Sequence, residues 1–287
     1  ASIVGYGQWS DVVCVSEIGK PLYNFYGYVV EGVYESLEDI ENSPKTAKHP
    51  ENGVYNRSNT VWVGDIKYKD INGDGVINEQ DRTDIGSPLP LFTFGWNNTF
   101  RYKGFDLNIF LNGSYGNKVL NYSLMNGPSG GLASMRSAWV NQNNDAIKDR
   151  AQLVPIDPDK VYEGSNWYDD ITNVKVANTG TKTPRPTLND PNDNDRLSTR
   201  YIEDGSYLRI KNLTLGYTFP KKWMQKIKFD NIRIYCNIQN LYTFTKYSGY
   251  DPEVGASTQD SSGYAYGVDN GRYPSPTTYS FGVSLTF

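Results

Sequence analysis

The end of the chain alternates between apolar and small polar residues. From Tyr279 to Phe287 every second residue is aromatic or aliphatic, and the residues between them are serine, glycine or threonine. Because successive side chains of a β-strand point to opposite faces, this period predicts a strand over Thr278–Phe287 with one apolar and one polar face. A strand of a soluble sheet shows the same alternation, so the pattern alone leaves the surroundings of the strand open.

Further segments of similar length share this two-residue period. Single residues interrupt it at Asn98, Phe110 and Tyr235. The segment Tyr23–Tyr34 is rich in β-prone residues without clean alternation, and it is expected to be extended. The alternating segments are Phe92–Tyr102, Phe105–Tyr115, Tyr207–Phe219 and Ile232–Leu241.

Two charged residues begin one of these predicted strands. Counted by strict alternation, Arg209 and Lys211 share a face with Leu213 and Leu215. A charge costs about 2–4 kcal/mol at the midplane of a bilayer and little near its surface. The pattern therefore predicts a strand that extends beyond the hydrocarbon at one end.

Composition decides what kind of membrane segment is possible. The chain has 23 Tyr, 27 Gly and 14% aromatic residues, yet its mean hydropathy is −0.60. No stretch approaches the roughly 20 apolar residues of a transmembrane helix, whereas a barrel strand needs only about 9–11 residues with one apolar face. The sequence thus predicts an all-β protein, namely part of a transmembrane antiparallel β-barrel.

The lengths of the connections suggest an orientation. Barrels of this class have short turns on the periplasmic side and long loops outside. If Phe287 ends at the periplasmic rim, Arg101–Gly104 and Pro220–Asp230 are periplasmic turns. The segments around 34–90, 124–206 and 246–276 are then long extracellular loops, and turn-forming residues such as those of Asn189–Asp195 fit this assignment.

One loop resembles a calcium-binding loop. Ca²⁺ is bound by roughly six to eight oxygen ligands, and the spacing of Asp, Asn and Gly in Asp70–Asp81 can bring such ligands together around a tight turn. The last position carries Asp81 where Glu is usual, and no amphipathic helix precedes the loop, so an Asx-rich turn held by its own hydrogen bonds is the alternative. The predicted ligands are Asp70, Asn72, Asp74, Val76, Asn78 and Asp81.

Signals for enzymatic or nucleic-acid function are weak. A single His49 cannot supply a multi-histidine zinc site and makes a Ser-His-Asp triad difficult. The adjacent acids Asp169 and Asp170 point different ways and are expected to be solvated rather than a glycosidase pair. The net charge of −4 and the lack of a basic run argue against nucleic acid. Cys14 and Cys236 are expected to be unpaired apolar side chains, although one disulfide is possible.

Aromatic residues in the loops are candidate substrate contacts. Flat rings can stack on the apolar faces of sugars. Packing within loops is the alternative for each of them, as it is for Trp139. The predicted substrate-binding residues are Trp167, Tyr168, Tyr264 and Tyr266.

Several motifs, in the same order, resemble the SusC/RagA family of TonB-dependent outer-membrane transporters. The similarity extends over nearly the whole chain, and a series of motifs is more specific than any single one. The motifs are Gly64–Asn78, Ile85–Pro88, Tyr102–Leu107, Asp204–Asn212, Gln239–Leu241, Thr245–Glu253 and Tyr279–Phe287.

The resemblance implies a barrel of about 22 strands with an N-terminal plug, located in the outer membrane as a multi-pass protein. It implies TonB-driven import of oligosaccharides, or less often peptides, together with a SusD-like surface lipoprotein. Residues 1–287 would be the C-terminal portion of that barrel, without the plug, the TonB-contacting segment and the earlier strands, so the chain alone cannot transport. A final aromatic such as Phe287 resembles the signal read by the barrel-assembly machinery.

Two other functional classes stay open at this point. The first is a soluble β-sandwich that is stabilised by calcium and binds carbohydrate. The second is a surface glycan hydrolase, for which the sequence nominates no pair of carboxylates. Recovery of the full gene product in the outer membrane would separate a barrel from a soluble sandwich.

Overall fold

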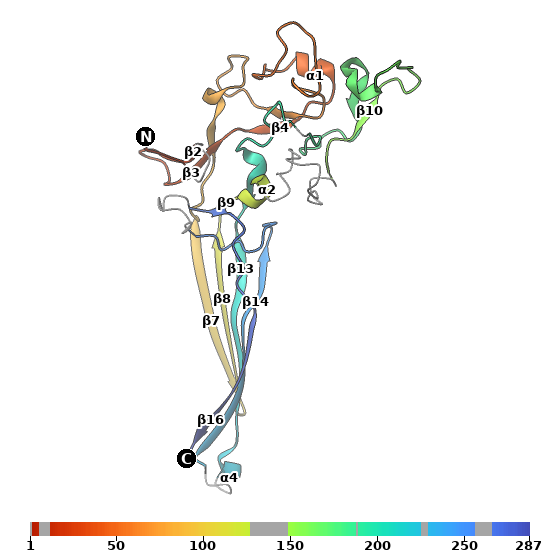
Figure 1. Cartoon of the computed structure of the whole chain (residues 1–287). Coiled ribbons are helices and arrows are strands. Elements are labelled where there is room, and N and C mark those ends of the chain that lie inside the picture. The colour runs from red at the N-terminus through yellow and green to blue at the C-terminus, as the bar shows by residue number, and fades with distance from the viewer. Residues whose placement is uncertain (1, 6–11, 127–148, 188, 225–228, 256–265) are drawn as a thin grey trace. The chain divides into compact units, whose positions relative to one another are not determined.

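A computed structural model describes residues 2–5, 12–126, 149–187, 189–224, 229–255 and 266–287 (Figure 1). The chain divides into two compact units. We call the unit of residues 88–119, 204–255 and 271–287 the sheet unit, and the unit of residues 1–87, 120–203 and 256–270 the loop unit.

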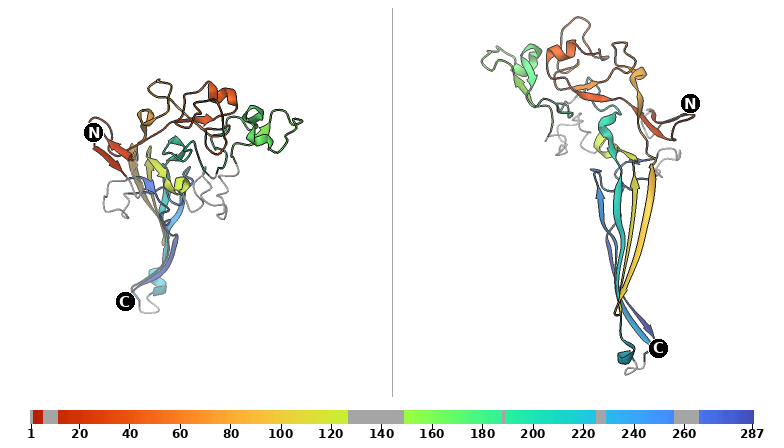
Figure 2. Two further views of the ribbon diagram at one scale, coloured as in Figure 1. Left: turned by 45° about the horizontal axis from the view of Figure 1, so that its top comes forward. Right: turned by 180° about the vertical axis from the view of Figure 1, so that it is seen from behind.

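The sheet unit is built on five long antiparallel strands that lie side by side (Figures 1 and 2). Their order across the sheet is β16-β14-β13-β8-β7, so β16 and β7 are the edges within the part of the chain that the structure describes. All five strands predicted from alternation are confirmed, and β14 is longer than predicted. The strands are β7 (Phe92–Tyr102), β8 (Phe105–Tyr115), β13 (Tyr207–Thr218), β14 (Asn231–Thr245) and β16 (Thr278–Thr286).

The cross-strand register places the apolar side chains on one face. Ile109 of β8 pairs with Leu213 of β13, which pairs in turn with Ile238 of β14. Phe281, on the same face of β16, is 81% exposed. The sheet therefore has one exposed apolar face and one polar face.

A β-bulge in β13 corrects the prediction for Arg209. Ile210 pairs with Leu111 and Asn212 with Phe110, so Lys211 is an extra residue opposite a continuous partner strand. An extra residue reverses the alternation beyond it. Arg209 therefore lies on the polar face, where its side chain is 2% exposed, and the prediction that it shares the face of Leu213 is wrong.

Two of the interruptions predicted in the alternation are aromatic residues on the polar face that lie over glycines. A Cβ on Gly95 would lie 3.4 Å from the ring of Phe110 in the neighbouring strand, and one on Gly282 would lie 2.3 Å from the ring of Tyr235. An aromatic ring that covers a cross-strand glycine fills the space which the missing side chain leaves. The departures from alternation are thus part of the packing of the polar face.

Two short connections lie at one end of the sheet. Lys103 (φ 48°) and Gly104 (φ 89°) form a two-residue turn between β7 and β8, and positive φ at both positions is the geometry of a type I′ hairpin turn. Between β13 and β14 the chain forms α4 (Lys221–Met224). The N–H of Thr218 donates to the carbonyl of Gly104 at 2.8 Å, so the two connections are neighbours.

The loop unit contains short strands and single helical turns. The small sheets are β1-β2-β3-β6, β4-β5 and β10-β11, and β9 pairs with β12 and with β15. The strands are β1 (Ser2–Gly5), β2 (Val12–Ser16), β3 (Asn24–Gly27), β4 (Val30–Val33), β5 (Ile66–Tyr68), β6 (Thr83–Gly86), β9 (Lys118–Asn121), β10 (Leu153–Pro155), β11 (Val174–Val176), β12 (Ile202–Asp204) and β15 (Val268–Asp269). The helices are α1 (Leu37–Glu41), α2 (Tyr122–Asn126), η1 (Glu79–Asp81), η2 (Trp167–Asp169), η3 (Ile171–Asn173) and η4 (Thr199–Tyr201).

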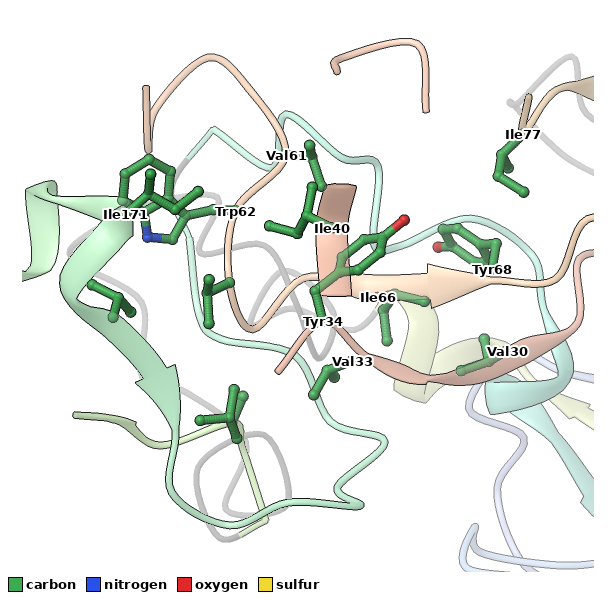
Figure 3. Packing of buried hydrophobic residues seen from close by; sticks show 14 of the residues in the cluster. Val30, Val33, Tyr34, Ile40, Val61, Trp62, Ile66, Tyr68, Ile77 and Ile171 are labelled. Atoms are coloured by element: carbon green, nitrogen blue, oxygen red, sulfur yellow. The ribbon is translucent and has the colours of Figure 1, made fainter. Parts of the chain in front are cut away.

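The core of the loop unit is aromatic and β-branched. Trp62, Tyr34, Ile66 and Tyr68 are each at most 1% exposed, and they pack around β4 and β5 (Figure 3). The predicted extended segment Tyr23–Tyr34 supplies β3 and β4 to this unit, which confirms that prediction.

Next to this core, the turn-rich segment Asn189–Asp195 is partly buried. Asn192 and Asn194 are 0% exposed. The Asn194 Oδ1 accepts from the N–H of Ile66 at 2.7 Å, and Asn192 Nδ2 donates to the Ile66 carbonyl at 2.9 Å. These two amides satisfy backbone groups of β5 as a neighbouring strand would.

Both cysteines are free, as expected. Cys14 is buried in the loop unit, and burial raises the pKa of its thiol to about 12. Cys236 is half-buried in β14.

Candidate functional site

An ion pair crosses the polar face of the sheet. Arg233 of β14 reaches over β13 to Asp106 of β8, with Nε 3.0 Å from Oδ1 and Nη2 2.5 Å from Oδ2. The guanidinium passes over Gly216, where a Cβ would lie 2.4 Å from Nη2. Bidentate ion pairs between arginine and a carboxylate are strong contacts. This one links β14 to β8 across β13.

A second charged cluster holds the segment after β14 against the sheet. The buried guanidinium of Arg209 contacts the carboxylate of Asp251, and it donates to Glu253 Oε2 at 2.7 Å and to Thr243 Oγ1 at 2.8 Å. Burial raises the pKa of Asp251, but the amide N–H groups of Glu253 and Ser275 and the Arg209 guanidinium outweigh burial and hold it below its usual value.

Arg209 and Asp251 belong to two separate sequence motifs, and neither motif predicts this contact. Two features of the sequence could have indicated the contact. Arg209 is a charged residue in a strand whose polar face is otherwise neutral, and Asp251 and Glu253 are two acids in one distant loop. A buried cation requires a partner of opposite charge. The two motifs Asp204–Asn212 and Thr245–Glu253 therefore meet in space.

The predicted calcium-type loop is held by its own backbone. Asp70 accepts from the N–H groups of Gly73 at 2.7 Å and Gly75 at 2.8 Å, and Asn72 Oδ1 accepts from the N–H of Asp74 at 2.9 Å. These amides, that of Gly75 above all, lower the pKa of Asp70. The carboxylate is therefore ionised at neutral pH and turned into the loop.

The last predicted ligand closes this loop. Asp81 is 0% exposed, and its two oxygens accept from the N–H groups of Ile71 at 2.9 Å and Asn78 at 2.7 Å. Asp81 thus ties the two ends of the loop together, and this is also the role that the Asx-turn alternative would give it. The carbonyl of Val76 accepts a long contact, 3.4 Å, from the Asn78 amide.

Carboxylate and amide oxygens, as in this loop, are the ligand type that a hard cation such as Ca²⁺ prefers. Here the oxygens do not all point to one open position. The Asn72 amide nitrogen lies 3.0 Å from Asp74 Oδ2 and 3.3 Å from Gln80 Oε1, so a donor occupies part of the space between the acceptors. Within the described ranges, no three His, Cys, Asp or Glu side chains come together as a metal-binding group. A calcium ion would depend on amide, carbonyl and water oxygens beside the carboxylates.

Three of the four aromatic candidates lie within the described residues, where Trp167 and Tyr168 contact each other and Tyr266 contacts a different ring. Trp167 and Tyr168 are half-buried in η2, where Trp167 packs against the core and the Arg57 guanidinium lies 4.5 Å from the centre of the Tyr168 ring. Tyr266 stacks on Tyr23, with ring centres 6.5 Å apart. Tyr264 lies outside the described residues.

The adjacent acids of the loop unit are engaged in separate ion pairs. Asp169 pairs with Arg57 at 3.4 Å, and Asp170 with Lys160 at 2.6 Å. The hydrogen bond from Lys160 is the largest of the causes that lower the pKa of Asp170 to about 2. Two carboxylates that are turned to different cations do not make the acid and base of a hydrolase.

The fold is that of a two-faced antiparallel sheet. Its long strands have an exposed aromatic-rich face and a polar face that carries ion pairs, an alternation that strands of outer-membrane β-barrels also have. No helix in the described part of the chain has the length and apolar character needed to cross a membrane.

Comparison with known proteins identifies the relatives. The chain is 32% identical over 274 residues to TonB-dependent receptor P3 of Formosa agariphila, which covers 94% of this chain and 22% of that receptor. It is 27% identical over 221 residues to TonB-dependent receptor SusC of Bacteroides thetaiotaomicron, which covers 77% of this chain and 17% of that receptor. No protein-family profile matches the chain.

Solved structures show the same fold. The RagAB peptide transporter matches 97% of this chain and 24% of its own with a TM-score of 0.58 at 21% identity. The RagAB peptide importer in its open-open state matches 98% of this chain and 24% of its own with a TM-score of 0.56. The chain is thus related to SusC/RagA-like TonB-dependent receptors, which confirms the resemblance, and it spans about a fifth of the curated relatives it matches. These relatives are receptors and not enzymes.

Proposed function

We propose that this chain is the C-terminal part of the barrel wall of a TonB-dependent outer-membrane transporter, and that the complete protein imports oligosaccharides or peptides. The observation that carries the proposal is the two-faced sheet, in which Phe281 and its neighbours expose an apolar surface while Arg209 and Arg233 lie on the other side. A soluble β-sandwich would cover that apolar face with a second sheet.

The edges of the sheet support a larger, closed barrel. The described strands leave one side of β7 and one side of β16 without a partner strand. Unpaired backbone groups cannot face lipid, since each would cost several kcal/mol. Further strands of the same polypeptide are the proposed partners, up to the 22 or so of a transporter barrel around a plug.

The relatives support the substrate classes and partners. The similar solved structures are named as a peptide importer, and one similar curated receptor is SusC. A SusD-like surface lipoprotein and TonB, reached through another part of the protein, are the proposed partners. Trp167, Tyr168, Tyr264 and Tyr266 stay proposed substrate contacts.

Membrane fractionation tests the transporter proposal. The full-length gene product should sediment with outer membranes and resist extraction with carbonate or high salt. Deletion of Phe287 should lower the amount inserted, and a strain that carries the deletion should grow more slowly on the imported nutrient. Recovery of the intact protein in the soluble fraction without detergent would favour the calcium-stabilised β-sandwich instead.

We also propose that Ca²⁺ stabilises the loop Asp70–Asp81. The turned-in oxygens of Asp70, Asn72 and Asp74 support this role. Calorimetry on the folded protein should show calcium uptake that Asp74→Ala abolishes and that Asp149→Ala, a change in another loop, does not. Equal heats for the two variants, or no calcium uptake by the unmodified protein, would contradict calcium binding. The loop would then be a turn that is held by its own hydrogen bonds alone.

A further inference from the structure

We propose that the turn end of the sheet binds the phosphate groups of anionic phospholipids. We define the turn end as Arg101–Phe105, Thr218–Met224, Phe229–Arg233 and Thr286–Phe287. This inference rests on the proposed function, because it takes the apolar face to be embedded in a bilayer. It adds a ligand class and a binding surface to that function.

The turn end gathers two connections and the end of the last strand. The Gly104 carbonyl accepts from Thr218, the Ile232 carbonyl from the N–H of Phe219 at 3.0 Å, and the Thr286 carbonyl from the N–H of Asp230 at 2.8 Å. Figures 1 and 2 show α4 and the C-terminus at the same end of the strands. Residues from five strands and α4 therefore belong to one surface.

A row of aromatic rings runs along this surface. Phe105 lies 4.6 Å from Tyr217, Tyr217 lies 5.1 Å from Phe219, and Phe219 lies 6.5 Å from Trp223, between ring centres. Trp223 of α4 is 58% exposed, while Met224 beside it is 5% exposed. Aromatic side chains at the ends of barrel strands lie at the level of the lipid headgroups. The row therefore places α4 at the height of the phosphates.

Exposed cations accompany the aromatic row. Lys103, Lys221 and Lys222 are exposed, and none of them forms an ion pair with a residue that the structure describes. The Lys103 ammonium lies 5.2 Å from the centre of the Tyr102 ring. Lysine stems can lie along an apolar rim while the ammonium reaches the headgroups. Among the described residues no carboxylate pairs with these cations, and a phosphate would supply the anion.

A cleft of about 530 Å³ lies at the β7–β8 turn, where Arg101 and Arg233 of the polar face line it together with Asp106, the acid that pairs with Arg233. These two arginines alternate with the apolar residues of their strands, so they lie on the opposite side from the aromatic row, and the cations beside that row are the lysines. The positive charge of these lysines complements an anionic headgroup and opposes a cationic one.

The test compares lipids and lysines in the intact transporter. The full-length protein is placed in nanodiscs of phosphatidylcholine with or without phosphatidylglycerol, and the number and affinity of retained lipids are measured by native mass spectrometry. The variant is Lys103→Gln with Lys221→Gln and Lys222→Gln. The control is Lys48→Gln with Lys175→Gln and Lys182→Gln, which removes three exposed lysines from the loop unit.

The unmodified protein should retain phosphatidylglycerol over phosphatidylcholine, and increasing salt should reduce that preference. Each lysine near an anionic surface is worth about fivefold in affinity, so the turn-end variant, which lacks three lysines, should lose about a hundredfold, and the control variant less than twofold. Equal retention of the two lipids by the unmodified protein, or equal losses for the two variants, would overturn the proposal. Failure of the protein to enter any nanodisc would instead contradict the transporter function.

Discussion

The ring of Tyr235 covers Gly282, the residue directly opposite it in the β14–β16 ladder. A Cβ on residue 282 would lie 2.3 Å from the ring Cζ, so the two residues fit only because one of them has no side chain. This contact specifies the register of the last strand by shape, in addition to the backbone hydrogen bonds.

Gly282→Ala should therefore destabilise the folded protein. Overpacking of this kind costs about 1–3 kcal/mol, and the loss should appear in the free energy of unfolding of the full-length protein in detergent. Ser284→Ala, on the same face of the same strand, is the control and should change little. In a Tyr235→Ala background the effect of Gly282→Ala should largely disappear, and an unchanged effect there would refute the contact.

Arg209→Met should release the segment that follows β14. It leaves the carboxylate of Asp251, which is 6% exposed, without its cation. An unpaired buried charge costs about 3–5 kcal/mol, so proteolysis within residues 246–255 should accelerate. Adding Asp251→Asn should restore part of the protection, whereas Lys211→Met, which removes a cation 3.6 Å from Glu253, should have a small effect.

The loop around Asp190 should become less stable as the pH rises from about 4 to about 6. Burial raises the pKa of Asp190 from 3.8 to about 6, with the neighbouring charges of Asp195 and Asp65 acting in the same direction. The folded state then binds the proton more tightly than the unfolded state. The protonated carboxyl therefore contributes fully to stability below the unfolded pKa, and this contribution is lost as the pH rises through the folded pKa. Amide hydrogen exchange of residues 192–195, corrected for intrinsic rates, measures it. Asp190→Ala should flatten the pH dependence, and an unchanged slope would contradict the assignment.

Asn194→Asp should be more damaging than Asn194→Ala. The Asn194 amide nitrogen donates to Asp190 Oδ1 at 2.6 Å and to Asp65 Oδ1 at 3.3 Å. Alanine loses these bonds at about 1–3 kcal/mol for each buried group left unpaired, whereas aspartate adds a third negative charge at the same place. Thermal unfolding of the two variants measures the difference. Asn52→Asp, the same change in an exposed loop, should stay within about 0.5 kcal/mol.

The strands of the sheet unit could be predicted because the two faces of the sheet differ in polarity, which gives most of their residues a two-residue period. The limits of β7 and β8 agree with the prediction, since a two-residue turn after Tyr102 requires the next strand to begin at Phe105. The bulge was not predicted. The sequence carries a signal of it, because the apolar positions change from even numbers at Leu208 and Ile210 to odd numbers at Leu213, and the register against β8 assigns the extra residue to Lys211.

The loop unit was less predictable, because its order comes from contacts distant in sequence. Asn194 and Ile66 are held by a hydrogen bond between segments that no local pattern connects, and Asn-Asp-Gly composition indicates only a turn. The ligands of the calcium-type loop could be proposed from spacing. Their engagement by backbone amides, as in Asp81 with Ile71, required the structure.

The extra residue in β13 gives that strand two counting frames. Even-numbered residues such as Leu208 and Ile210 point to the apolar face before Lys211, and odd-numbered residues such as Leu213 do so after it. Removing one residue here would move the side chains of half of the strand to the opposite face. Arg209 would then lie on the apolar face, away from its acidic partners. The position of Lys211 is therefore one at which this sheet cannot accept a single-residue deletion.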